Sequence, residues 1–430
     1  MSKCSNFESK KITIIGGGAA GMVAAIFAAK NIGGYNIRII EKNDKIGRKL
    51  LATGNGRCNM TNRFCHETFK NISKFMDQFN FQETINFFKK IGVITREESD
   101  GRIYPYSEQA VSVQQALKSE LESLNVEIIY NAYVKKVETI SNGFNIVTEI
   151  NDKCKNSKRK DNIESFFSEK IIIATGGKAG PQYGSTGEGF NIARNFGHTI
   201  IKPIPSLTQI TSSQLFFKEL KGVRAKGSVS LLKNLELLDM EIGEIQFTDS
   251  GLSGICIFNL SRLIRLEDSS YNDYIVKIDL MPEFTQQQVF DLLVERAVYL
   301  GDRKVKEFLN GLINEKLACV ILKESGLDEN IINCYEIYQL NKKQLKKIVT
   351  YLKNWNIPVS GTKGFKEAQV TSGGIDLQQL DKYTLESKLI KDVYFAGEVV
   401  NVDGKCGGYN LQWAWTSGYI TGNGASKNIE

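Results

Sequence analysis

The sequence predicts an α/β fold in which a Rossmann-like domain is interrupted by an inserted β-rich domain with a small helical part. Three observations predict this fold. A β-branched run at 11–15 leads directly into a glycine-rich turn and then a helix of small apolar residues. A second strand follows and ends at Glu41. Residues 201–354 then change to short strands followed by charged helical segments.

Composition and charge place the chain among ordinary globular proteins. Its 430 residues are 42% hydrophobic and 24% charged, which is enough for two or three domains with a substantial core. The formal net charge of +7 is spread along the chain, so a nucleic-acid partner is not expected. Residues 1–10 hold no cationic segment followed by an apolar run, and "GMVAAIFAAK" is too short to span a bilayer. We therefore expect a cytoplasmic location and no membrane partner.

The cysteines and histidines do not form a metal-binding motif. The eight cysteines contain no CxxC pair, and the chain has only two histidines. We therefore expect reduced thiols and no metal site.

The turn after the first strand carries a dinucleotide-binding pattern. Gly16, Gly18 and Gly21 fill GxGxxG, and Glu41 lies 20 residues beyond the last glycine. Gly16 permits a tight turn, Gly18 the close approach of a pyrophosphate, and Gly21 close helix packing. The carboxylate of Glu41 is suited to ribose hydroxyls, and the N-terminus of the following helix supplies an anion site. These residues predict a dinucleotide ligand without distinguishing FAD from NAD.

Residues 125–174 read as three or four strands joined by short turns. We interpret the polar loop "NDKCKNSKRKDN" between them as a solvated hairpin tip, because no aromatic residues interleave with its charges. The turn "ATGG" and the helix opening "GSTGEGF" follow, and this second glycine-rich turn lacks GxGxxG. It therefore predicts a second contact with the same ligand. We expect the first domain to resume at 355, where "VYFAGE" is a strand ending in a glycine and a carboxylate.

A family resemblance rests on nine stretches taken together. They are "IIGGGAAG", "GRKLLATGNGRCN", "ATGG", "GSTGEGF", "FTDSGLSG", "VTSGGI", "TLESKL", "YFAGE" and "DGKCGGYNLQWAWTSG". They resemble the HI0933-like flavoproteins, a family that includes aminoacetone oxidases and bile-acid dienone reductases. The resemblance implies an FAD-binding domain of the two-dinucleotide-binding type, formed by 1–200 and 355–430, with a substrate or cap domain at 201–354.

The resemblance also implies which residues hold FAD. They are Gly16, Gly18, Ala19, Ala20 and Gly21 at the pyrophosphate, Glu41 and Lys42 at the adenosine ribose, Val134 near the adenine, Arg48, Lys49 and Asn55 on the way to the isoalloxazine, Thr175, Gly176 and Gly177 at the adenine half, and Gly397 and Glu398 at the ribityl and pyrophosphate region. The sequence departs from many relatives in "FTDSGLSGI", where Asp249 and Ile255 replace His and Pro. The departure leaves the identity of the substrate open.

The stretch from 403 to 418 predicts a helix N-terminus beside the flavin. Negative charge accumulates near N1 of a reduced flavin, and the positive end of a helix stabilises it. We expect Gly407 and Gly408 to leave room for the ring and Asn410 to cap the helix. The backbone of Gly408, Tyr409, Asn410, Leu411 and Gln412 would contact the cofactor. We expect Trp413 and Trp415 to pack in the core rather than stack on the flavin.

Several side chains are candidates for acid–base or redox roles. Tyr409 and Arg57, with Arg102, are candidate substrate or proton-relay residues. Cys58 and Cys406 lack the spacing of a CxxC redox pair, and a redox sensor through either one is a separate alternative. The histidines are His66 and His198, and we expect His198, at a probable helix exit, to be structural.

The activity implied by the resemblance is that of a flavin-dependent reductase. FAD would accept a hydride from NADH or NADPH, which docks transiently because a second GxGxxG is missing, and would pass it to the C=C bond of a steroid or bile-acid enone. An oxidase that uses oxygen and acts on a small amine or aminoketone is the first alternative. An FAD-dependent tRNA-modifying protein is another, suggested by "GGGAAG" and the net positive charge. The expected partner is a small-molecule substrate, and the oligomeric state is left open.

Overall fold

The structure is a computed structural model that describes residues 9–150, 162–265, 270–427 and 429. Its contacts divide the chain into two compact units, 1–205 with 369–430, and 206–368. Most of the polar loop expected at a hairpin tip, residues 151–161, lies outside the described residues.

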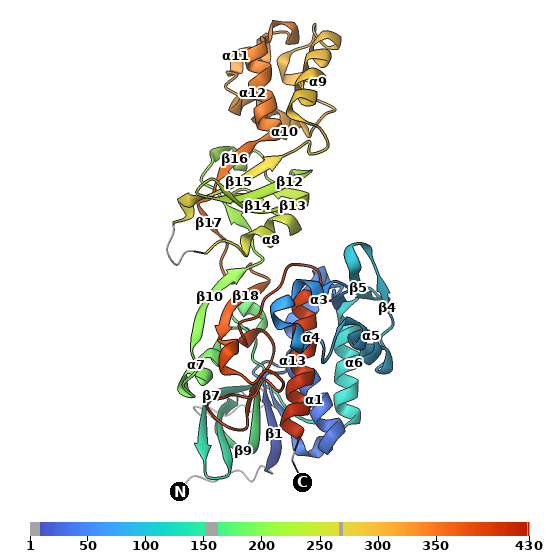
Figure 1. Ribbon diagram of the computed structural model, residues 1–430, viewed down its shortest axis with the longest axis vertical. Coiled ribbons are helices and arrows are strands. Elements are labelled where there is room, and N and C mark those ends of the chain that lie inside the picture. The colour runs from blue at the N-terminus through green and yellow to red at the C-terminus, as the bar shows by residue number, and fades with distance from the viewer. Residues whose placement is uncertain (1–8, 151–161, 266–269, 428, 430) are drawn as a thin grey trace. The chain divides into compact units, whose positions relative to one another are not determined.

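The first unit is built on a parallel sheet (Figure 1). Its strands follow the order β6-β2-β1-β9, with β19 on the other side of β9, and all of these pairs are parallel. An antiparallel extension, β7-β8-β9, continues the sheet. The strands are β1 (Lys10–Ile15), β2 (Ile37–Ile40), β6 (Glu127–Ile129), β7 (Ala132–Ile140), β8 (Gly143–Ile150), β9 (Asn162–Ile173) and β19 (Val393–Phe395).

Helices and two small sheets complete the first unit. The helices are α1 (Ala19–Ile32), α2 (Arg48–Ala52), α3 (Cys65–Thr68), α4 (Ser73–Met76), α5 (Phe81–Lys90), α6 (Ala110–Ser123), α7 (Glu188–Asn195) and α13 (Tyr409–Ser426). One small sheet consists of β3 (Thr61–Asn62), β5 (Arg102–Pro105) and β4 (Thr95–Glu97), and the other of β10 (Ile200–Ser206) and β18 (Val370–Ile375).

Glycines on α13 bring this helix into close contact with α1. A Cβ atom at Gly418 would lie 2.5 Å from the carbonyl oxygen of Ala20, and one at Gly422 would lie 2.4 Å from that of Ala24. Contacts advance by four residues on both helices, so α1 and α13 run parallel. Their N-termini therefore lie at the same end of the pair.

The second unit is an antiparallel sheet with helices (Figure 1). The strand order is β16-β15-β12-β13-β14-β11-β17. The strands are β11 (Ile210–Thr211), β12 (Arg224–Lys233), β13 (Glu236–Phe247), β14 (Gly251–Ser253), β15 (Tyr274–Asp279), β16 (Trp355–Pro358) and β17 (Gly361–Thr362). The helices are α8 (Ile255–Ser261), α9 (Gln286–Tyr299), α10 (Glu315–Glu324), α11 (Glu329–Cys334) and α12 (Lys342–Lys353).

The predicted fold class is confirmed, a Rossmann-like domain interrupted by a β-rich domain with a helical part. Residues 355–368 are expected in the first domain from the sequence, but the structure groups them with the second unit. The reason is strand pairing, because β16 pairs with β15 and β17 pairs with β11. Trp355 on β16 also packs against Phe216 and Phe247, with ring centroids 5.1 and 5.9 Å away.

The α1–α13 contact predicts that Gly422→Ala destabilises the protein. Helix propensity alone would stabilise the variant by about 1 kcal/mol, whereas the collision with the Ala24 carbonyl predicts a net loss of about 1–3 kcal/mol. Urea unfolding measures the difference. Gly364→Ala is the control, since nothing lies within 4 Å of its added Cβ atom. A Gly422→Ala protein more stable than wild type would contradict the close contact.

Candidate functional site

A large cleft lies in the first unit at the carboxyl ends of β1, β2, β9 and β19. It encloses about 1290 Å³ of space, part of it open to solvent. The residues that directly follow these four strands, at 16–20, 41–43, 174–176 and 396–398, all line it. In open parallel sheets, ligands bind in this position, beyond the carboxyl ends of the strands.

The turn between β1 and α1 forms a cradle for an anionic ligand. Gly16 has a φ of +105°, and a Cβ atom there would lie 2.6 Å from the carbonyl oxygen of Ala174. A Cβ atom at Gly21 would lie 2.0 Å from the carbonyl oxygen of Gly16, so Gly21 allows α1 to pack closely. Gly18 is open, with nothing within 4 Å of its added Cβ. It precedes α1, whose first turn has no side-chain cap and no acidic residue. The positive end of α1 therefore faces the cleft.

Glu41 holds a buried carboxylate at the end of β2. Its side chain is enclosed, with the residue only 7% exposed. One oxygen accepts a hydrogen bond from the Gly17 backbone nitrogen at 2.8 Å, and the other accepts from the backbone nitrogen and side-chain amide of Asn43 at 2.8 and 2.6 Å. These donors fix the carboxylate on the cleft wall, where hydroxyl groups of a ribose can donate to its remaining lone pairs.

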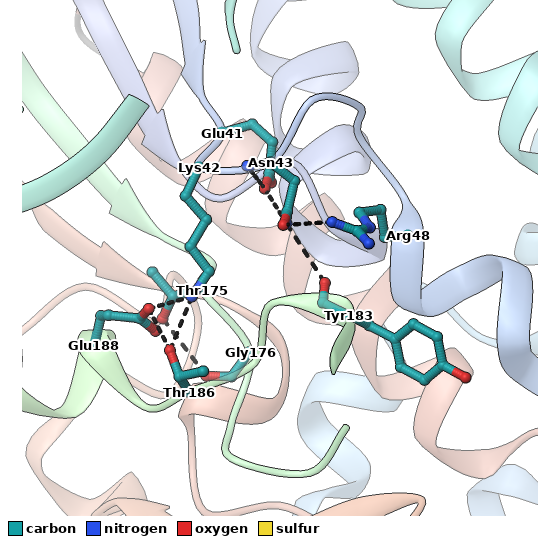
Figure 2. A network of polar contacts seen from close by, with 9 residues as sticks. All are labelled: Glu41, Lys42, Asn43, Arg48, Thr175, Gly176, Tyr183, Thr186 and Glu188. Carbon is teal, nitrogen blue, oxygen red and sulfur yellow. Dashed lines mark hydrogen bonds and ion pairs between the residues drawn. The ribbon is translucent and has the colours of Figure 1, made fainter. Parts of the chain in front are cut away.

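Two lysine–glutamate pairs also lie on the cleft wall. Lys42 forms an ion pair with Glu188 (Figure 2). Burial acts to raise the pKa of Glu188, but hydrogen bonds from Lys42 and Thr186 outweigh it and hold the pKa below its ordinary value. Lys49 pairs with Glu398 at 2.7 Å, and the other oxygen of Glu398 accepts from the Thr371 backbone nitrogen at 2.8 Å.

Gly177 does not line the cleft, but it allows close packing beside the cleft. A Cβ atom there would lie 2.3 Å from the Thr371 hydroxyl oxygen and 2.7 Å from Glu398 Oε1. The Thr371 hydroxyl in turn accepts hydrogen bonds from the backbone nitrogens of Lys178 and Ala179 at 2.7 and 2.9 Å. Glycine at 177 therefore lets β18 approach the turn after β9.

The first turn of α13 borders the cleft through Asn410 and Leu411. Trp413 and Ala414 follow on the same wall. Trp413 is only 2% exposed and donates to the Gly397 carbonyl at 3.1 Å, so it belongs to both the core and the cleft wall. Trp415 is buried in the core and donates to the Met60 carbonyl at 2.8 Å.

Gly408 and Asn410, at the start of α13, have different roles from those expected. Gly408 does not line the cleft. Its φ is +98°, and an added Cβ atom would lie 2.4 Å from the Thr61 carbonyl oxygen. Glycine is therefore required there by the neighbouring protein backbone. Asn410 does not cap the helix, because its side chain bonds the backbone of Gly404 and Lys405, at 2.8, 3.0 and 3.2 Å, and so fastens the preceding loop.

Gln412 and Tyr409 point their side chains away from the cleft. Gln412 is buried, accepts from the hydroxyls of Thr61 and Thr84 at 2.5 and 2.9 Å, and donates to the Phe79 carbonyl at 2.9 Å. Tyr409 packs edge-on against Phe69, with centroids 6.3 Å apart. Burial raises the pKa of Tyr409, so the phenol stays protonated at neutral pH.

Arg57 is neutralised by neighbouring carboxylates instead of facing the cleft. It pairs with Glu98 at 2.5 Å and Glu108 at 3.3 Å and lies over the Tyr104 ring at 4.2 Å. Arg102 lies 3.8 Å from Asp100. Asn55 is exposed and does not line the cleft; its φ is +55°.

The remaining candidates are cysteines and histidines, and they differ in burial and in their contacts. Burial raises the pKa of Cys58 to about 12, so Cys58 is a thiol at neutral pH. Cys406 is half-buried, and its sulfur lies 3.6 Å from the side-chain oxygen of Gln369. His198 is buried, with Nε2 2.8 Å from the Ser387 hydroxyl, and burial lowers its pKa. His66 is exposed and pairs with Asp77 at 2.9 Å.

Asp249 and Ile255, where the resemblance to the family leads us to expect His and Pro, lie in the second unit. Asp249 is exposed and pairs with Lys221 at 3.3 Å, which lowers the pKa of Asp249. Ile255 is 46% exposed and begins α8.

Most of the residues proposed to hold FAD thus come together in one cleft. Those that line it are Gly16, Gly18, Ala19, Ala20, Glu41, Lys42, Arg48, Lys49, Val134, Thr175, Gly176, Gly397, Glu398, Asn410 and Leu411. Those that do not line it are Gly21, Asn55, Gly177, Gly408, Tyr409 and Gln412. Other residues that line the cleft were not predicted from the motifs, among them Asn43, Tyr183, Ser185, Glu188, Gln369 and Trp413. Glu188 stands inside "GSTGEGF", whose placement after a glycine-rich turn was the available signal.

A family model described as the HI0933-like protein Rossmann domain matches residues 10–424. The chain belongs to the HI0933-like family. A 3-dehydro-bile acid delta(4,6)-reductase of Clostridium scindens is 35% identical over 429 residues, which cover 97% of this chain and 99% of the relative. Ribosomal RNA dihydrouridine synthases of Haemophilus influenzae and Escherichia coli are each 28% identical, covering 94% of this chain and 96% and 95% of theirs.

Two solved structures share the fold. One is 3-ketosteroid delta1-dehydrogenase from Sterolibacterium denitrificans in complex with 1,4-androstadiene-3,17-dione, with a TM-score of 0.51, 11% identity, and coverage of 98% of this chain and 100% of that chain. The other is a quinol–fumarate reductase with menaquinol, with a TM-score of 0.50, 14% identity, and coverage of 98% and 72%. The family supports FAD as the cofactor and an oxidoreductase activity, and the two solved structures show the fold alone.

Across the residues that the structure describes, no helix has the length and apolar character needed to span a membrane. Within the same residues, no group of three or more His, Cys, Asp or Glu side chains is arranged to hold a metal ion. The cytoplasmic location expected from the sequence stays a prediction.

The geometry at Gly408 predicts that Gly408→Ala impairs folding. The variant combines a left-handed φ with the Thr61 collision, so we expect a loss of about 3 kcal/mol or more in the free energy of unfolding. Gly56→Ala is the matched control. It has a φ of +85° with nothing within 4 Å of the added Cβ, and we expect it to cost about 1 kcal/mol. Equal stability of the two variants in urea unfolding would contradict the role assigned to Thr61.

Proposed function

We propose that the protein is an FAD-dependent reductase that saturates a C=C bond conjugated with a carbonyl group, in a steroid- or bile-acid-like substrate. The observation that carries the proposal is the match with the 3-dehydro-bile acid delta(4,6)-reductase over 97% of this chain. The cleft supports it, because its residues fit the cofactor that such a reaction needs.

The fit of the cleft to FAD rests on its two ends. At one end, the open Gly18 and the uncapped N-terminus of α1 are suited to a pyrophosphate, and the buried carboxylate of Glu41 is suited to a ribose. At the other end, the N-terminus of α13 borders the cleft through Asn410 and Leu411. No acidic residue stands in the first turn of α13, so its positive end is available to stabilise negative charge.

In the proposed reaction, the cofactor and the protein have different roles. When bound, FAD supplies a carrier for a hydride. The substrate C=C bond gains that hydride at its β-carbon and a proton at its α-carbon, and its π-bond is lost. Neither Tyr409 nor Arg57 lines the cleft, so we propose that water delivers the proton. The chain binds and orients both molecules and keeps positive helix ends beside the developing charge.

We propose NADH or NADPH as the source of the hydride. The family supports FAD, and we assign it to the cleft that contains the single GxGxxG of the sequence. A nicotinamide cofactor would then dock only for the transfer and be released as NAD⁺ or NADP⁺. This keeps the electron balance, with one hydride gained from the nicotinamide for each C=C bond saturated.

Reduction of uridine in ribosomal RNA is a second candidate. Two relatives, each 28% identical over 94% of this chain, are ribosomal RNA dihydrouridine synthases. The uracil ring also contains a C=C bond conjugated with a carbonyl, so the same hydride and proton additions would serve. We therefore propose ribosomal RNA, instead of the tRNA suggested by the sequence, as the alternative RNA substrate. This alternative predicts that the protein binds RNA and that the binding weakens steeply as the salt concentration rises.

Anaerobic stopped-flow on the flavin-loaded protein tests these proposals. We expect NADH or NADPH to bleach the flavin absorbance and a 3-keto-4,6-diene steroid to restore it. Restoration by an rRNA fragment and not by the steroid would favour the second candidate. Restoration by oxygen alone, after reduction by an aminoketone, would instead identify the oxidase. Failure of both nicotinamides to bleach the flavin would refute the proposed hydride source.

Glu41→Gln should weaken the binding of FAD. Glutamine keeps the size of the side chain but loses the charge-assisted hydrogen bonds, which predicts a rise in the Kd for FAD of about 10- to 100-fold. Titration of the apoprotein followed by flavin fluorescence measures this Kd. Glu169→Gln is the control, because Glu169 lies at the surface and pairs with Lys11 at 3.1 Å. An unchanged Kd in Glu41→Gln would remove Glu41 from the FAD site.

A further inference from the structure

A short segment with three left-handed glycines lies on one wall of the cleft. This segment, residues 180–187, is called the glycine flap below. Gly180, Gly184 and Gly187 have φ values of +73°, +104° and +90°. Residues 183–185 of the flap line the cleft. An added Cβ atom at Gly184 would lie 2.5 Å from the side-chain amide of Asn43, so the flap backbone packs directly on the residues that follow β2.

Polar contacts fasten the flap to the end of β2 (Figure 2). The Lys42 ammonium pairs with the Glu188 carboxylate and lies 2.9 Å from the Thr186 hydroxyl, which also bonds Glu188. The Asn43 side-chain amide lies 3.4 Å from the Tyr183 carbonyl oxygen. Two charged and two polar groups from segments far apart in the sequence therefore meet at this point.

The ion pair joins two walls of the cleft and is partly shielded from water. Lys42 follows β2, Glu188 is the first residue of α7, and both line the cleft. Their side chains are 24% and 15% exposed. Such a pair is stronger than a fully exposed one, and salt in the solvent still reaches it.

The flap contains few large apolar side chains. In the sequence "GPQYGSTG", Pro181 and Tyr183 are the only large side chains with apolar surface. The three glycines permit a change of backbone conformation at low cost. Side-chain contacts between the flap region and the end of β2 are made by Lys42, Asn43 and Glu188.

We propose that the Lys42–Glu188 pair is a latch that holds the glycine flap against the end of β2 and thereby slows the release of FAD. Glu188 is a positioning residue in this proposal, since it acts through Lys42 and the flap. The proposal rests on the proposed function, in which FAD occupies the cleft. It adds to that function a role for the Lys42–Glu188 pair in retaining the cofactor.

The test measures the rate of FAD release from the holoenzyme. The loaded protein is diluted, and the rise in free-flavin fluorescence is followed for wild type, Glu188→Gln, Lys42→Met and the double variant. We expect each single variant to release FAD about fivefold faster and the double variant to be no faster than either single. Sodium chloride at 0.5 M should accelerate the wild type and leave the variants nearly unchanged.

A matched pair elsewhere in the first unit provides the control. Lys30 and Glu120 form an ion pair 2.7 Å apart and are partly exposed, and neither residue lines the cleft. Lys30→Met and Glu120→Gln should leave both the release rate and its salt dependence at wild-type values. Thermal unfolding of all variants separates the latch from a general loss of stability. Should Glu188→Gln fail to fold, Thr186→Val replaces it, with about a twofold acceleration expected.

Three outcomes would overturn the proposal. Release at the wild-type rate from Glu188→Gln and Lys42→Met, with normal loading, would show that no latch exists while leaving the proposed function intact. Multiplied effects in the double variant would show that the two residues act separately. A wild-type protein that holds no FAD would overturn both the proposed function and the latch.

Discussion

The close approach of α1 to its neighbours is the constraint on which the site depends. Gly21 lets the helix approach the turn that follows β1, and Gly418 and Gly422 let α13 approach α1. Because α1 and α13 run parallel, their positive ends lie at the same side of the first unit, and both border one cleft. Side chains at these glycines would separate the helices and displace the groups that form the cleft. The anion-binding character of the site is therefore a consequence of packing in the core.

The sequence predicted those parts of the site that are local in the chain. The strand, glycine turn and helix at 10–32 form a continuous unit, so the roles of Gly16 and Gly21 followed from spacing alone. The carboxylate of Glu41 was predicted in the same way, since it directly follows the neighbouring strand. Each of these assignments requires only the geometry of one βαβ unit, which the sequence pattern specifies.

Contacts between distant segments were not available from the sequence. Gly408 is a glycine because of the Thr61 carbonyl, and Asn410 fastens a loop instead of capping a helix. Residues 355–358 lie beyond a helical stretch and were assigned to the resumed first domain, but β16 pairs with β15. In all three cases, the residue type was compatible with several structural roles. The residue that it contacts in the folded protein determines which role applies. A glycine or asparagine before a helix has several possible physical reasons, and only the tertiary structure selects one.

The polar groups of the cleft indicate how one framework can serve relatives with different substrates. Glu41, Lys49 and Glu398 line the cleft and are engaged with the chain itself, while Arg57 and Tyr409 are held elsewhere by carboxylates and packing. A protein framework that positions a hydride carrier but adds few acid–base side chains fixes the type of reaction more strictly than the identity of the substrate. Relatives named for a bile acid and for ribosomal RNA are consistent with this division. Asp249 and Ile255 in the second unit, where the resemblance to the family leads us to expect His and Pro, are the first positions to test for a role in substrate selection.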